Sequence, residues 1–111
     1  MRKAALAAAL VVLAIAVPAA ASSSQSDADV SPERMAELRA FLTQDCGSCH
    51  GLTRKGGLGS PLTPEAIADR SDEDLALTIL HGVPGTPMPP WSALLTEAEV
   101  DAIVRMLRNG D

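Results

Sequence analysis

The chain has 111 residues, of which nine are Lys or Arg and 14 are Asp or Glu, so its formal net charge is −5. Because the basic residues form no stripe that could neutralise phosphates, this balance excludes a nucleic-acid-binding protein. The chain has one Phe, one Trp and no Tyr, so aromatic side chains add little bulk to the core of so small a domain. Its two cysteines are only three positions apart, which excludes a disulfide framework. We therefore expect an apolar cofactor to complete the core.

The first 21 residues are expected to be a cleaved signal peptide. Arg2 and Lys3 precede an unbroken apolar run at positions 4–17, and small residues follow at 19–21. The run has 14 residues, fewer than the ~20 that cross a bilayer, so we expect no membrane span after cleavage. We therefore predict an exported, periplasmic protein.

Cleavage would leave residues 22–111, with seven basic and 14 acidic side chains and a net charge of −7. Residues 22–30 are rich in Ser and Asp without periodicity, which predicts a flexible tether. Residues 31–111 form the predicted domain. Its acidic surface serves either solubility alone or a partner with a complementary positive patch, which electrostatic steering would bring together.

Three helices are predicted within this domain, and no segment predicts a strand. Their starts are marked by capping residues: Ser31 before Pro32, Ser71, and Thr96 with Glu99 as a capping box. A shorter helix is expected from Thr63-Pro64-Glu65, and the Pro- and Gly-rich residues 83–90 are expected to form an extended loop. The pattern predicts an all-α fold of three to four short helices around a cofactor.

Cys46, Cys49 and His50 form a C-x-x-C-H motif. In this motif both thiols bond covalently to a haem, and the histidine binds its iron. A thioredoxin-like redox pair would be expected within alternating strands and helices, which this chain lacks. A zinc site would need two more Cys or His ligands, and only His50 and His81 exist. We therefore predict one covalent haem c attached through Cys46 and Cys49, with its iron held by His50.

Met88 is predicted as the second axial ligand. It lies within residues 85–91, GTPMPPW, where fixed proline dihedrals can hold a thioether against iron at low entropic cost. Other roles are expected for the remaining candidates: core packing for Met35 and Met106, and a partly exposed helix end for His81. With both axial positions filled the iron has no open site, which predicts a one-electron carrier and not an enzyme.

Further contacts of the cofactor are predicted from the loops. The second nitrogen of His50 should donate to a backbone carbonyl of residues 59–61, which would fix the ring. Trp91 is expected either to pack on the haem edge and donate to a propionate, or to be a plain core residue. Arg54 and Lys55 are expected either to pair with propionates or to lie in a solvated loop.

With these features the domain resembles the class I cytochrome c family from about Ser31 to its end. The resemblance implies a cytochrome c fold, with its first and last helices packed together at the haem. The family's two cysteines, histidine and later methionine correspond to Cys46, Cys49, His50 and Met88.

A narrower resemblance is to the c55X group, small periplasmic cytochromes encoded with the haem c/haem d nitrite reductase of denitrifying bacteria. It is carried by residues 49–53, 55–59, 79–82 and 85–91, and Ser60 departs from the group by separating a Gly from a Pro. The resemblance implies a redox protein partner: nitrite reductase as electron acceptor, or a haem-maturation dehydrogenase as electron donor. We expect a monomer. The alternatives are a haem enzyme or gas sensor in which Met88 is displaced, and an assembly factor for the reductase cofactor.

Overall fold

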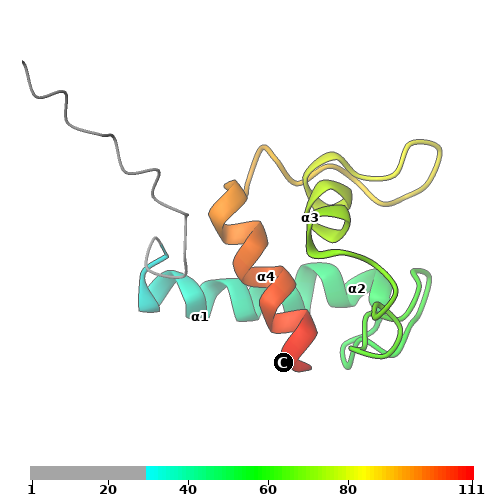
Figure 1. Cartoon of the computed structure of the whole chain (residues 1–111), viewed down its shortest axis with the longest axis horizontal. Coiled ribbons are helices and arrows are strands. Elements are labelled where there is room, and N and C mark those ends of the chain that lie inside the picture. The colour runs from blue at the N-terminus through cyan, green and yellow to red at the C-terminus, as the bar shows by residue number, and fades with distance from the viewer. Residues whose placement is uncertain (1–29) are drawn as a thin grey trace, which may run out of the picture.

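A computed structural model of the chain describes residues 30–111, which contain helices and no strand (Figure 1). The elements in chain order are α1 (Pro32–Phe41), the π-helical η2 (Leu42–Cys46), α2 (Gly47–His50), α3 (Asp72–His81) and α4 (Glu97–Asn109). The predicted all-α fold class is confirmed. Within the described residues, none of these helices is long and apolar enough to cross a membrane.

The predicted signal peptide and most of the predicted tether lie outside the described residues. Val30, the last residue of that tether, is described, and its side chain is buried in the hydrophobic core. Val30 therefore packs with the predicted domain that begins at Ser31.

Each of the three predicted helices begins at its predicted capping residue. The cap contacts are Arg34 N–H to Ser31 Oγ, Asp74 N–H to Ser71 Oγ, and the reciprocal pair between Thr96 and Glu99. At these positions a side-chain oxygen satisfies a backbone donor that has no partner inside the helix. Gly82 and Gly110 end α3 and α4, both with positive φ.

The helix expected from Thr63-Pro64-Glu65 is wrong, because the segment forms only consecutive turns. Its backbone hydrogen bonds span three residues in one case and four in another, because the amides of Ala66 and Ile67 both donate to the Thr63 carbonyl. Only a few residues separate Thr63 from the next cap at Ser71, too few to offset the cost of nucleating a helix.

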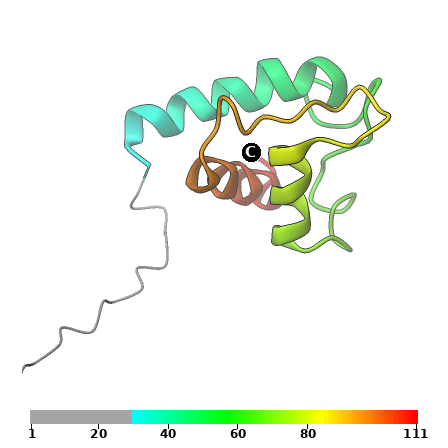
Figure 2. The ribbon, with the colours of Figure 1, turned by 90° about the horizontal axis from the view of Figure 1, so that it is seen from above.

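The segments α1, η2 and α2 form one continuous rod, and the turned view shows it above the other two helices (Figure 2). At the join, the Gly47 N–H donates to the Leu42 carbonyl, five residues back. Such a π turn holds one residue more than an α turn, and π turns often occur at functional sites. The sequence analysis did not predict it.

Helix α4 packs against both α1 and α3 (Figure 1). Its buried stripe includes Val100, Ile103, Val104 and Leu107, whose spacing places them on one face of the helix. Leu38, Leu42, Leu75 and Met106 complete the centre of the core. The burial of Met106 confirms its predicted role as a core side chain.

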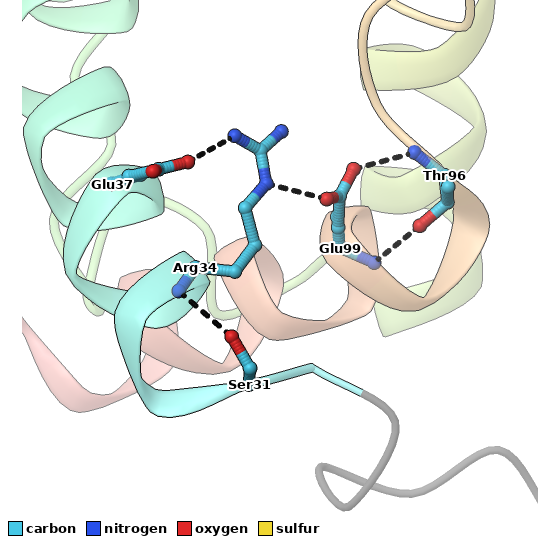
Figure 3. Close-up of polar contacts among 5 residues, drawn as sticks. All are labelled: Ser31, Arg34, Glu37, Thr96 and Glu99. Atoms are coloured by element: carbon cyan, nitrogen blue, oxygen red, sulfur yellow. Dashed lines mark hydrogen bonds and ion pairs between the residues drawn. The ribbon is translucent and has the colours of Figure 1, made fainter.

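An ion pair joins the starts of α1 and α4 (Figure 3). Arg34 Nε lies 2.6 Å from Glu99 Oε1, and Arg34 Nη1 lies 2.7 Å from Glu37 Oε2. The other oxygen of Glu99 accepts the Thr96 N–H at 2.8 Å. The hydrogen bond from Arg34 lowers the pKa of Glu99, so this carboxylate serves its own helix cap and the neighbouring helix at once.

Candidate functional site

The rod brings the C-x-x-C-H residues together on one wall of a cavity. Cys46 ends η2, whereas Cys49 and His50 lie in the single turn of α2. All three are partly buried and line the same cavity. A helical turn places residues three or four positions apart on one face, so both thiols and the imidazole reach one ligand.

Cys46 and Cys49 form no disulfide with one another. Burial, followed by the nearby Asp45 carboxylate, raises the pKa of Cys46 to about 11. A redox-active C-x-x-C pair needs the opposite, a cysteine whose pKa is lowered so that it forms a thiolate. Within residues 30–111 there is also no cluster of three His, Cys, Asp or Glu side chains suited to a metal ion, so the geometry favours neither the redox pair nor the zinc site.

His50 is fixed by the loop that follows it. Its Nδ1 lies 2.7 Å from the Ser60 carbonyl oxygen, which can only accept, so Nδ1 carries the proton and donates. The prediction of a carbonyl from residues 59–61 is confirmed, and it is Ser60, the residue that departs from the c55X pattern, that provides it. This contact leaves Nε2 as the unprotonated nitrogen, the form that binds a metal.

Two backbone contacts press the loop against the histidine. The Gly56 N–H donates to the His50 carbonyl at 2.9 Å, and the Gly59 N–H donates to the Cys49 carbonyl at 2.8 Å. At Gly59, a Cβ atom would lie 2.7 Å from His50 Nδ1. Only glycine lets the loop approach the imidazole this closely.

Met88 reaches the same cavity from an extended loop, as predicted for residues 83–90. The Val83 N–H donates to the Met88 carbonyl at 3.2 Å, and the Trp91 N–H donates to the Ile79 carbonyl at 3.0 Å, so both ends of the loop are tied to α3 or its exit. The turn depends on Gly82, at φ +67, where a Cβ would lie 2.6 Å from the Met88 carbonyl oxygen.

The cavity has a volume of about 490 Å³, within the ~300–1,000 Å³ of cofactor sites. Its walls are mainly apolar and draw on the same side chains that form the core, such as Leu42, Leu75, Ile103 and Leu107. A large, mainly apolar space of this kind suits a flat apolar ring.

The structure separates the predicted site residues from the other candidates. The residues that line the cavity are Cys46, Cys49, His50, Met88 and Trp91. The cavity is not lined by the other candidates, which are Met35, Met106, His81, Arg54 and Lys55. Trp91 combines features of both its predicted roles, because it lines the cavity and also packs against Phe41 edge-on, with ring centroids 5.0 Å apart.

Sequence reasoning missed Arg70 and Thr78, which also line the cavity. Arg70 directly precedes the Ser71 cap of α3 and the acidic first turn of that helix, so its position in the sequence suggests a helix start and not a cavity wall. Thr78 lies four residues after Asp74 on the same helix face, and this spacing was the available signal.

These residues fit a covalently attached haem. Two cysteine side chains lie beside an imidazole whose Nδ1 is engaged by the Ser60 carbonyl, and a thioether lines the same apolar cavity. This donor set matches thioether attachment with histidine and methionine as axial ligands.

Comparisons with known proteins agree with this chemistry. Residues 33–107 match the family described as cytochrome C oxidase, cbb3-type, subunit III. Over 86 residues the chain is 51% identical to cytochrome c55X of Pseudomonas aeruginosa, covering 76% of this chain and 72% of that relative.

Two solved structures are also similar. A c-type cytochrome named NirC aligns with a TM-score of 0.71 at 49% identity, over 73% of this chain and 95% of that one. The dihydro-heme d1 dehydrogenase NirN, in complex with DHE, aligns with a TM-score of 0.60 at 37% identity, over 63% of this chain but only 15% of that protein. The similarity to NirN is therefore confined to a small part of the larger protein.

Proposed function

Because this chain belongs to the c-type cytochromes, in the group of cytochrome c55X, we propose that it is a periplasmic monohaem carrier of single electrons. The observation that supports this most is the shared cavity of Cys46, Cys49, His50 and Met88. Bound haem c supplies a one-electron ferric/ferrous couple. The single C-x-x-C-H motif in the sequence accounts for one haem.

The roles of the residues follow from their positions. Cys46 and Cys49 would hold the ring through thioether bonds, so that it stays attached through many redox cycles. His50 would bind the iron through Nε2, while Ser60 keeps the imidazole from rotating. Met88 would bind the iron from the loop, and a thioether ligand raises the reduction potential relative to a second imidazole.

We propose that the partner belongs to the nitrite reductase system of denitrification. Support comes from the similarity to cytochrome c55X and NirC, and from the likeness of this chain to a part of a dehydrogenase. Oxidation by a dehydrogenase releases electrons that a one-electron carrier can accept. The chain would thus either donate to nitrite reductase or accept electrons while the special haem of that enzyme is made.

A genetic comparison separates the two roles. Deleting the gene should abolish the special haem if this protein is needed for its maturation, and should only slow nitrite turnover if the protein is a donor. Complementation with a Met88→Ala variant is the matched control, because this variant keeps the chain and its haem attachment but changes the iron.

The ligation itself is tested by the absorption spectrum of protein expressed in the periplasm, oxidised and reduced, with and without carbon monoxide. We expect low-spin bands, a sulfur-to-iron charge-transfer band in the oxidised form, and no response to carbon monoxide. A high-spin spectrum that shifts with carbon monoxide would overturn the electron-carrier proposal. It would favour the alternative, a haem enzyme or gas sensor with a displaceable Met88.

A further inference from the structure

One cation lies in the wall of the cavity. Within residues 30–111, Arg70 is the one Arg or Lys among the lining residues, beside otherwise mainly apolar side chains. Its Nε donates to Asp74 Oδ2 at 2.5 Å, and its Nη2 donates to Thr78 Oγ1 at 2.7 Å. Thr78 lines the cavity as well, so the guanidinium is held on the wall by two contacts from α3.

The backbone of Arg70 is fixed from a second direction. Arg108 of α4 donates through Nε to Asp72 Oδ1 at 2.8 Å and through Nη1 to the Ile67 carbonyl at 2.8 Å. Its Nη2 donates to the carbonyl of Arg70 itself. The last helix therefore holds the segment that presents Arg70, and Arg108 is a positioning residue.

The guanidinium keeps donors available for another ligand. Nη1 makes no hydrogen bond with the described residues, while Asp74 and Thr78 engage Nε and Nη2. An arginine fork in this state is suited to a carboxylate, which it binds through charge-assisted hydrogen bonds. Asp74 pairs with the guanidinium on one side, and the Arg70 side chain is 41% exposed, so its remaining donors are accessible to such a ligand.

We propose that Arg70, supported by Thr78, binds a propionate carboxylate of the haem. The proposal rests on the proposed function, since it needs haem in the cavity. A haem carries its propionates on the edge away from the vinyl groups that react with cysteines. The thiols come from η2 and α2, whereas Arg70 and Thr78 come from the entrance of α3 and from α3 itself, so different elements of the cavity wall supply the thiols and the donors for a propionate.

The expected consequence is a higher reduction potential. The positive charge of Arg70 offsets the propionate charge, which otherwise stabilises the ferric form. Arg70→Gln should therefore lower the midpoint potential, shifting the oxidised-to-reduced ratio at a fixed potential by roughly tenfold, which is 59 mV for one electron. Arg70→Lys should give a smaller shift, because it keeps the charge but loses the fork.

Arg39→Gln is the matched control. It makes the same charge change on α1, where Arg39 lies beside a separate hollow with Met35 and Met106 and does not line the haem cavity. The holoproteins are compared by potentiometric titration and by resonance Raman spectroscopy of the propionate bending modes. We expect Arg70→Gln to change both readouts and Arg39→Gln to change neither appreciably.

If Arg70→Gln and Arg39→Gln have the same midpoint potential and the same propionate bending modes, the proposal is overturned. If Arg70→Gln does not accumulate, Thr78→Val replaces it, since it removes only the supporting hydroxyl, and propionate modes identical to those of the wild type then overturn the proposal. Failure of the proposed function is distinct, because it would appear in the wild type as a protein without covalent low-spin haem.

Discussion

Gly59→Ala tests how closely the loop must approach the haem ligand. The new Cβ would lie 2.7 Å from His50 Nδ1 and 2.8 Å from Cε1, well inside van der Waals contact. Gly59 is not among the residues with positive φ, so alanine suits its backbone and the effect is purely steric. Either the ring moves, or the loop moves and Nδ1 loses the Ser60 carbonyl.

The expected magnitude combines two costs. Overpacking costs about 1–3 kcal/mol, and losing one hydrogen bond costs roughly 1 kcal/mol. Their sum is about 2–4 kcal/mol, and the lower end alone would lower the melting temperature of a domain of this size by roughly 8–16 °C. The rotated imidazole should also change the electron paramagnetic resonance spectrum of the oxidised iron, since that spectrum reports ligand orientation.

Gly47→Ala is the matched control from the same motif. A Cβ at Gly47 would meet Leu52 at 3.4 Å and 3.5 Å, which is ordinary contact, and alanine favours the helix by up to about 1 kcal/mol over glycine. Thermal unfolding by circular dichroism and the resonance spectrum are recorded for both holoproteins. If Gly59→Ala is as stable as the wild type and Gly47→Ala and has the same resonance spectrum, the close approach of the loop to the imidazole does not contribute to stability.

Three further outcomes are expected. Met88→Ala should keep the haem attached but open the iron to carbon monoxide, and an unchanged absorption spectrum would remove Met88 from the ligands. Glu99→Gln keeps a capping side chain but loses the charge that pairs with Arg34, so it should lower the melting temperature at neutral pH. The pKa of Glu99 is lowered in the folded protein. The stabilisation is therefore present above the ordinary glutamate pKa of about 4.3 and is lost as the pH falls through the lower pKa of the folded state. The melting temperatures of the variant and the wild type should therefore converge in acid. Replacing both Cys46 and Cys49 by alanine should abolish attachment and folding, and a helical circular dichroism spectrum from this variant without haem would contradict that.

The sequence predicted the features that depend on neighbours along the chain. The caps at Ser31, Ser71 and Thr96 involve side chains and amides at most three residues apart, so their chemistry is readable directly. Likewise, the proline-rich context of Met88 implied a stiff extended loop, and the structure contains one.

The features that the sequence did not reveal depend on residues far apart in the chain. Arg108 binds the backbone at Ile67 and Arg70 from about 40 positions away, and no local pattern announces such a contact. The pairing of Arg34 with Glu99 spans 65 positions. The π turn also escaped prediction, because its five residues have no composition that distinguishes them from an α turn.

The shortage of aromatic residues and the shape of the core have one explanation. Leu42, Leu75, Ile103 and Leu107 belong both to the packed core and to the wall of the 490 Å³ cavity. At about 24 cal/mol for each Å³, an empty cavity of that size would cost on the order of 12 kcal/mol, as an upper bound since it opens to solvent. Whole domains are stable by only about 5–15 kcal/mol, so a ligand that fills this space would contribute a large share of the stability of the domain. A haem held by Cys46 and Cys49 would therefore take part in the core, and we expect its attachment to stabilise the fold, which the double cysteine variant tests.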